Sequence, residues 1–139
     1  MKPSRDIYTR MFHKLLDVIP DLLTIEESGK SKVDGFMDLN LDIIHRRPDR
    51  IIIALSHYYK HPSGDMIADP DMELAVYPLQ EKAEALAYQD CWGYRRVNGE
   101  DGITVDVRAK RELNSFLNQW LTNLINQGHC IKAEATTET

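Results

Sequence analysis

The sequence is poor in the features that mark membrane, secreted and metal-stapled proteins. Its two cysteines, Cys91 and Cys130, lie far apart and form no zinc-ligand spacing, so neither a disulfide framework nor a structural zinc site is expected. No apolar run approaches the roughly 18 residues that span a bilayer, and the first residues lead into an amphipathic stretch rather than the apolar core of a signal peptide. We therefore expect an unprocessed cytoplasmic protein with free thiols that does not bind membranes.

Short catalytic motifs are absent as well. The GxSxG, Walker and GxGxxG patterns do not occur. Pro70-Asp71 resembles the start of a PD-(D/E)xK nuclease core, but Glu81 and Lys82 are adjacent, and adjacent side chains point to opposite sides of a strand. The sequence therefore favours a binding protein without a cofactor over an enzyme.

The composition is that of one soluble domain. Of the 139 residues, 42% are apolar and 28% are charged, which suits a single hydrophobic core. The 22 acidic residues outnumber the 17 basic ones and give a net charge of -5, which disfavours non-specific binding to nucleic acid or anionic membranes. We expect residues 1–131 to form one domain and residues 132–139 to form a flexible polar tail.

Hydrophobic periodicity predicts a helix at each end of the chain and strands between them. The first helix spans residues 5–19, with Ser4 placed as its N-cap, and the last follows an apolar stripe from Leu113 to Ile125 and stops at Gly128. Alternation predicts strands at residues 36–43, 50–59, 72–77 and 83–89, with a turn at 46–49 and a loop at 60–65. Residues 92–97 and 104–107 are expected to form a hairpin around Asn98-Gly99.

These elements predict an α+β fold. It consists of an N-terminal helix, an antiparallel β-meander of five to six strands and a C-terminal amphipathic helix packed on one sheet face. Each helix has one apolar stripe to bury, so we expect both helices on the same face of the sheet.

Several separated motifs carry a family resemblance. They are His57-Tyr58-Tyr59, Gly64-Asp65-Met66, Asp69-Pro70-Asp71-Met72-Glu73, Tyr88-Gln89-Asp90, Gly93-Tyr94, and, toward the C-terminus, Arg108, Arg111-Glu112-Leu113, Phe116, Trp120, Asn123-Leu124 and Gln127-Gly128. In this order they resemble a family of small proteins of unknown function carried on plasmids, phages and integrative elements. The closing helix and the strand at 72–77 are more loosely similar to the bacterial YqiB family, also of unknown function. The resemblance covers about residues 50–129 and implies a mobile genetic element in the bacterial cytoplasm, with no catalytic residue.

Three acidic residues are spaced evenly along the first predicted strand. Asp34, Asp38 and Asp42 would point to one face, since alternate strand residues share a side. With the helices on the other face, this surface would be exposed. It provides solubility, or, as a sharper hypothesis, it is complementary to a basic partner such as a nucleic-acid-handling protein.

Basic and aromatic residues gather before the closing helix. They are Arg95, Arg96, Arg108, Lys110 and Arg111, with Trp92 and Tyr94. Such a set can hold single-stranded nucleic acid by ion pairing and base stacking. The interpretation that we favour is a solvated strand face whose arginines pair with the acids around them.

Ligand-type side chains are dense after the second strand. They are His57, Asp65, Asp69, Asp71 and Glu73, which offer nitrogen and oxygen to a divalent metal. A spacing of four residues aligns side chains only on a helix, and Pro62, Gly64 and Pro70 exclude a continuous one. Turn formation is the favoured interpretation of these residues.

The leading hypothesis is a non-enzymatic protein-binding accessory or inhibitory factor of a mobile genetic element. Its protein partner would belong to a host nucleic-acid-handling or defence complex, as for an anti-CRISPR protein. The alternatives are a nucleic-acid-binding module that uses the basic residues and a metal-dependent hydrolase that uses the ligand-type residues. The oligomeric state stays open.

Overall fold

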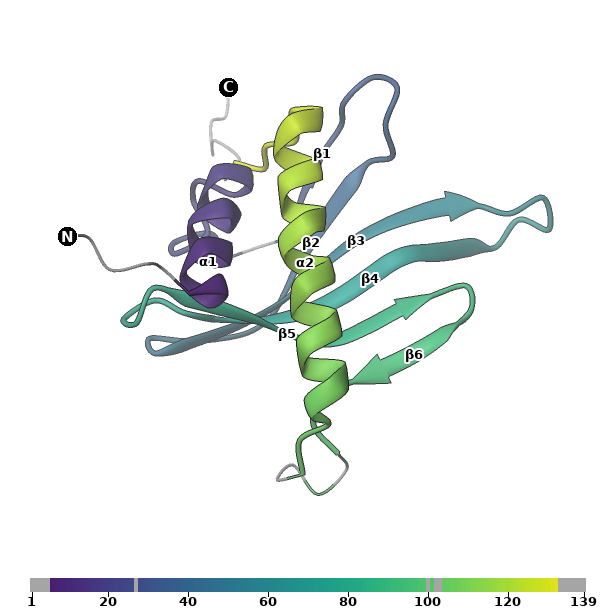
Figure 1. Cartoon of the computed structure of the whole chain (residues 1–139). Coiled ribbons are helices and arrows are strands. Elements are labelled where there is room, and N and C mark those ends of the chain that lie inside the picture. The colour runs from purple at the N-terminus through teal and green to yellow at the C-terminus, as the bar shows by residue number, and fades with distance from the viewer. Residues whose placement is uncertain (1–5, 27, 100, 102–103, 133–139) are drawn as a thin grey trace.

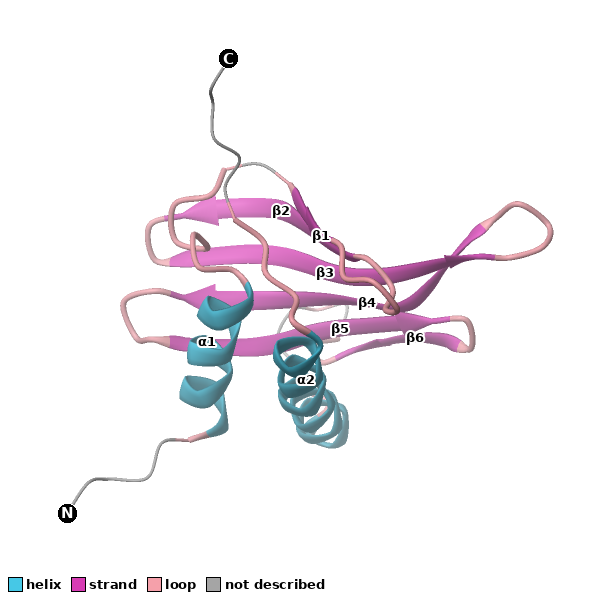
Figure 2. Ribbon diagram, turned by 90° about the horizontal axis from the view of Figure 1, so that it is seen from above, coloured by secondary structure: helices cyan, strands magenta, loops and turns pink. Residues whose placement is uncertain are grey.

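The computed structural model describes residues 6–26, 28–99, 101 and 104–132. Over these residues the chain forms two helices and one six-stranded antiparallel sheet whose strands lie in chain order (Figure 1). The elements are α1 (Ile7–Val18), β1 (Gly29–Ser31), β2 (Leu39–Arg47), β3 (Arg50–Lys60), β4 (Met66–Tyr77), β5 (Lys82–Asp90), β6 (Gly93–Arg96) and α2 (Val107–Gln127). Figure 2 shows α1 and α2 side by side on one face of the sheet. The predicted α+β fold is confirmed.

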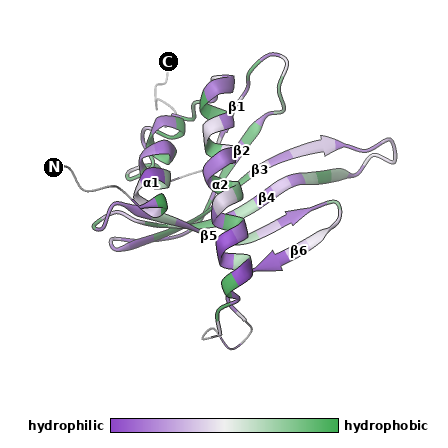
Figure 3. Ribbon diagram, in the orientation of Figure 1, coloured by the Kyte–Doolittle hydropathy of each residue, from purple (hydrophilic) through white to green (hydrophobic). Residues whose placement is uncertain are grey.

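The core lies between this sheet face and the two helices. Antiparallel register places Leu41 of β2 beside Leu55 of β3 and Leu55 beside Met72 of β4, and all three are buried. Leu15 of α1 and Leu117 of α2 are buried in the same cluster. In Figure 3 the ribbon of α2 changes between hydrophilic and hydrophobic residues along its length, as an amphipathic helix requires.

The helix ends differ partly from the prediction. The N-cap of α1 is Asp6 rather than Ser4, which lies outside the described residues: the Asp6 carboxylate accepts a hydrogen bond of 2.8 Å from the Thr9 backbone N–H. The Lys82 ammonium, 2.5 Å from the same carboxylate, lowers the pKa of Asp6 to about 2, together with the Thr9 bond. The predicted stop of α2 is confirmed, because Gly128 is left-handed with a φ of 92°.

Three strand boundaries also differ. The first predicted strand begins at Leu39 instead of residue 36. It continues through residues 46 and 47, which the sequence predicts to be part of a turn. The third begins at Met66, so Asp69-Pro70-Asp71 lies inside β4 rather than at its entry. The hairpin predicted around Asn98-Gly99 is confirmed only next to its turn. There one antiparallel bridge joins Asn98 to Val105, and the backbone N–H groups of Gly99 and Asp106 donate to the carbonyls of Thr104 and Val97, both at 2.8 Å. The rest of the first predicted arm forms β6, which pairs with β5 instead.

Arg46 explains why β2 runs further than predicted. Its guanidinium donates hydrogen bonds to the backbone carbonyls of Leu22, Leu23 and Ile25, in the segment that follows α1. A proline at residue 48 ends the strand two residues later. Arg46 therefore connects the sheet to the end of the first helix.

Helix α2 also closes an exposed sheet edge. Strand β6 pairs only with the end of β5, from Ala87 to Asp90, so the first half of β5 has no neighbouring strand on the side away from β4. There Asn114 of α2, only 2% exposed, accepts a hydrogen bond of 2.8 Å from the Ala85 backbone N–H. The Asn114 amide in turn donates to the Lys110 carbonyl at 2.7 Å. One side chain thus replaces the missing strand at this position.

We predict that Asn114→Ala lowers the free energy of unfolding by about 1–3 kcal/mol, because it leaves a buried backbone N–H without a partner. Urea denaturation measures this. The control is Asn126→Ala, the same substitution at an exposed position of the same helix, which should be neutral or slightly stabilising because alanine favours helix. Equal midpoints for the two variants would show that Asn114 does not protect the edge.

Candidate functional site

Acidic side chains of β2 and β4 lie together on the sheet face opposite the helices. In the register, Asp42 lies beside Ala54 and Ala54 beside Glu73, so both carboxylates are on one face, and Asp71 pairs with Ser56 on that same face. Neither helix covers this side of the sheet (Figure 2). We call Asp38, Asp42, Asp71 and Glu73 the acidic face.

A hollow of about 570 Å³ lies at the β1 end of the acidic face. Asp38 and Asp42 line it together with Asn40 and Tyr58, and Lys30 is its one basic residue among those described. Two of the three aspartates predicted from the sequence therefore meet. Asp34 does not join them, because it lies in the turn before β2, where strand alternation does not apply.

Hydroxyl groups, and not cations, contact these carboxylates. Tyr58 Oη donates to Asp71 Oδ2 at 2.7 Å, and Ser28 Oγ donates to Asp42 Oδ1 at 2.9 Å. Burial and the Asp71 carboxylate raise the pKa of Tyr58, and Asp42 adds to this effect. Among the residues that the structure describes, no lysine or arginine forms an ion pair with the acidic face. Its negative charge is therefore available to a partner.

The predicted basic group does not form one patch. Arg95 and Arg108 both pair with Glu112 of α2, at 2.9 and 3.2 Å, and they lower the pKa of this glutamate. Arg96 points to the other sheet face, where it bonds to the hydroxyl of Tyr94. Lys110 turns to α1 and lies 5.8 Å from the Tyr8 ring centre. Arg111 and Trp92 are exposed, Trp92 by 90%.

The predicted metal-ligating residues are also separated. His57 lies on the helix face, whereas Asp71 and Glu73 lie on the acidic face, and Asp65 lies at the tip of the β3–β4 hairpin. Asp69 and His57 line the same groove, and the other three residues of this group do not line it. Over the described part of the chain, no three histidine, cysteine or acidic side chains are grouped to hold a metal ion.

A groove on the helix side of the sheet was not predicted. It measures about 480 Å³ and lies between α2 and the segment that joins β1 to β2. It is lined by Gly35, Phe36, Met37, His57, Asp69, Pro70, Tyr88, Phe116, Trp120, Asn123 and Gln127. All of these except the first three belong to the motifs that carry the family resemblance. That convergence is the signal by which the sequence could have indicated the groove.

Histidines connect the groove to the β1 edge. His57 Nδ1 donates to the Asp38 carbonyl at 2.9 Å, and its ring meets Trp120 edge-on with 5.5 Å between centres. His129, 5.8 Å from His57, lies 2.9 Å from Ser31 Oγ through its Nδ1. The Cys130 N–H donates to the same oxygen at 3.0 Å. The chain after α2 is thereby attached to β1.

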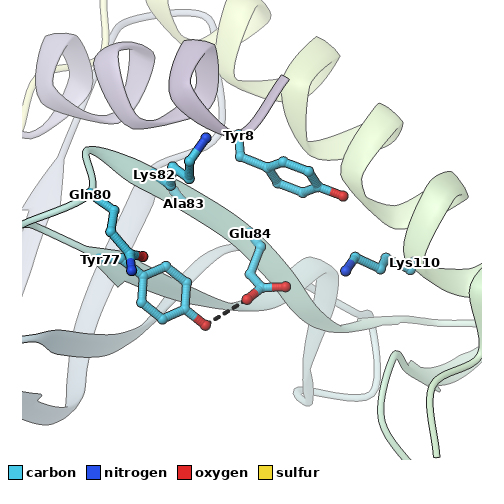
Figure 4. Close-up of a pocket in the computed structure, with 7 residues that line it drawn as sticks. All are labelled: Tyr8, Tyr77, Gln80, Lys82, Ala83, Glu84 and Lys110. Carbon is cyan, nitrogen blue, oxygen red and sulfur yellow. Dashed lines mark hydrogen bonds between the residues drawn. The ribbon is translucent and has the colours of Figure 1, made fainter. Parts of the chain in front are cut away.

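A smaller pocket of about 250 Å³ lies at the edge of β5, between the first turns of α1 and α2 (Figure 4). Figure 4 shows the Tyr77 hydroxyl directed at Glu84, to which it donates at 2.5 Å. Burial and this carboxylate raise the pKa of Tyr77 to about 12. Lys82 is held by Asp6, and Lys110 lies against Tyr8. Each of the three charged side chains that line this pocket already has a partner within the protein, so it is a weaker candidate site.

The chain belongs to the family described as Domain of unknown function (DUF6908), whose model matches residues 9–130. Comparison with curated proteins and with solved structures gives no match. The family description confirms the expected absence of an assigned function and supplies no site residue. Within the described residues, neither helix has the length and apolar character needed to cross a bilayer.

His129 makes the stability of the fold pH-dependent. Burial, and then the nearby His57, lowers the pKa of His129 below its ordinary value of 6.5. Between the lowered value and 6.5 the unfolded chain binds the proton more readily, so this contribution to stability is present above pH 6.5 and is lost as the pH falls. We predict that the urea midpoint decreases from about pH 7 to pH 5 and that His129→Gln flattens this decrease.

The control is His61→Gln, in the exposed loop of the β3–β4 hairpin, which should keep the pH dependence of the natural protein. If His129→Gln and His61→Gln gave the same slope as the natural chain, His129 would not be the titrating group. Measuring all three proteins over one pH series removes differences in buffer and salt.

Proposed function

We propose that the protein is a non-enzymatic, protein-binding accessory or inhibitory factor of a mobile genetic element, and that the acidic face binds a basic partner. The observation that carries this proposal is the group of carboxylates on the uncovered sheet face, with which no lysine or arginine forms an ion pair among the described residues. Such a surface attracts and orients a positively charged partner.

The partner class follows from charge. Proteins that handle nucleic acid have basic surfaces that bind phosphates. A surface of carboxylates can bind to the same lysine and arginine side chains in place of the phosphates. The mobile-element setting is supported by the family resemblance, and a host defence complex is the target that this setting suggests. The separated arginines give less support to direct binding of nucleic acid, because Glu112 already pairs with two of them.

The charge argument is tested with a fluorescein-labelled decalysine peptide, by anisotropy at low salt. We predict that Asp42→Asn combined with Glu73→Gln weakens binding by about threefold to tenfold, since exposed ion pairs are each worth about 0.2–1 kcal/mol. Raising the salt concentration should remove most of the binding to the natural chain. The control is Asp17→Asn with Glu26→Gln, which changes the net charge equally at exposed positions on α1 and in the segment after it.

An equal loss in both double variants would mean that net charge alone drives binding, and the acidic face would not be a binding surface. The biological partner is then sought by comparing host proteins retained by the natural chain with those retained by the two double variants. A partner that uses the acidic face is retained by the natural chain and the control and lost from Asp42→Asn/Glu73→Gln.

A further inference from the structure

The groove on the helix side is built from aromatic rings. Phe116 of α2 meets Tyr88 of β5 edge-on with 5.2 Å between ring centres and lies 6.2 Å from Trp120. Phe36, on the segment before β2, lines the groove from another side. The exposed fractions of Phe36 and Phe116 are 49% and 39%, so both rings are open to a ligand. Aromatic faces carry negative charge density and attract cations.

A carboxylate adds to that attraction. Asp69 lines the groove and is exposed, and its side chain forms no hydrogen bond or ion pair with any described residue. Burial and the Asp90 carboxylate, which accepts a hydrogen bond from the Tyr88 hydroxyl at 2.8 Å, raise the pKa of Tyr88 to about 12, and Asp69 adds to this effect. No lysine or arginine lines the groove among the described residues.

Trp120 also offers a hydrogen-bond donor to the groove. The residue is 7% exposed, and none of the described residues accepts a hydrogen bond from its indole N–H. Because this N–H is not a fully buried donor, it is accessible from the groove. A ligand in the groove can therefore bring a carbonyl oxygen to it.

We propose that the groove binds an arginine side chain within an extended segment of a partner protein. The guanidinium stacks on the exposed rings of Phe36 and Phe116 and pairs with the Asp69 carboxylate. A backbone carbonyl of the same segment accepts the Trp120 N–H. The groove and the acidic face lie on opposite sides of the sheet, so this site is independent of the function proposed above.

Arginine fits this groove better than other side chains. Its guanidinium is planar and stacks on aromatic rings, and it binds a carboxylate through two parallel hydrogen bonds. A lysine ammonium is compact and strongly hydrated, and it offers no flat face. Citrulline has almost the same shape as arginine but no charge, so it separates the effect of charge from the effect of shape.

The test is NMR titration with the tripeptide acetyl-Gly-Arg-Gly-amide. The chain has two tryptophans, and their indole N–H signals report separately on the groove and on Trp92, which is 90% exposed elsewhere. We expect the Trp120 signal to move with a Kd of about 1–10 mM, as for one side chain, while the Trp92 signal stays in place. The citrulline and lysine tripeptides should bind at least about fivefold more weakly.

Two variants locate the contacts. Asp69→Asn should weaken binding at least about fivefold by removing the charged hydrogen bonds, and Phe36→Ala should weaken it by removing an exposed ring that is not part of the core cluster. The control for the first is Asp65→Asn, the same change four residues earlier on the same hairpin. The Asp42→Asn/Glu73→Gln variant should keep the full response, which separates this site from the acidic face.

The proposal is overturned if the Trp120 signal does not move at about 50 mM arginine tripeptide, or if both indole signals move together. It is also overturned if citrulline or lysine binds as well as arginine, or if Asp69→Asn and Asp65→Asn behave alike. A spectrum of Phe36→Ala that keeps the backbone signals of the natural chain, with an undiminished response to the tripeptide, would overturn the stacking contact.

Discussion

The packing of α2 against the sheet determines where every surface of this molecule lies. Its apolar stripe, which includes Leu117 and Leu121, is buried on one sheet face beside α1. From the same helix, Asn114 occupies the open edge of β5, and Phe116 and Trp120 form one wall of the aromatic groove. Because two helices fill one face, the other face has no layer above it, and carboxylates can occupy it without a desolvation cost.

The register shift between β3 and β4 distributes neighbouring residues between these two surfaces. It falls between the Ser56–Asp71 and Tyr58–Ala68 pairs, so His57 lies opposite Asp69 and Pro70. The neighbouring residues His57 and Tyr58 point to opposite faces of the sheet. Tyr58 contacts Asp71 on the acidic face, and His57 contacts Trp120 on the helix side. A bulged strand bends and aims its side chains anew, which is why such positions often adjoin functional sites.

Much of the architecture could be predicted from the sequence, because it depends on local periodicity. The stripe of α2, the stop at Gly128 and the alternating strands are patterns within single segments. The strand partner of β6 could not be predicted in this way, since Asn98-Gly99 is a good turn sequence and the competing turn at residues 91–92 has no glycine of its own. The sequence could not decide between Ser4 and Asp6 as the N-cap of α1, because serine and aspartate are about equally favoured there. The ion pair of Asp6 with Lys82, far along the chain, could not be predicted from the local pattern.

The sites were harder to predict than the fold, because they depend on contacts between segments that are distant in the sequence. Closeness in sequence suggested a metal site of His57, Asp65, Asp69, Asp71 and Glu73, yet a strand sends alternate side chains to opposite faces, so dense ligand-type residues on two paired strands are divided by the sheet. The groove shows the reverse: Tyr88 and Trp120 are separated by a strand, a connecting segment and half a helix, and they meet because α2 crosses the sheet. The two faces of the sheet also differ in the cations that they favour. Carboxylates that face solvent, as on the acidic face, attract any cation. A carboxylate beside aromatic rings, as in the groove, selects the shape of the cation as well as its charge.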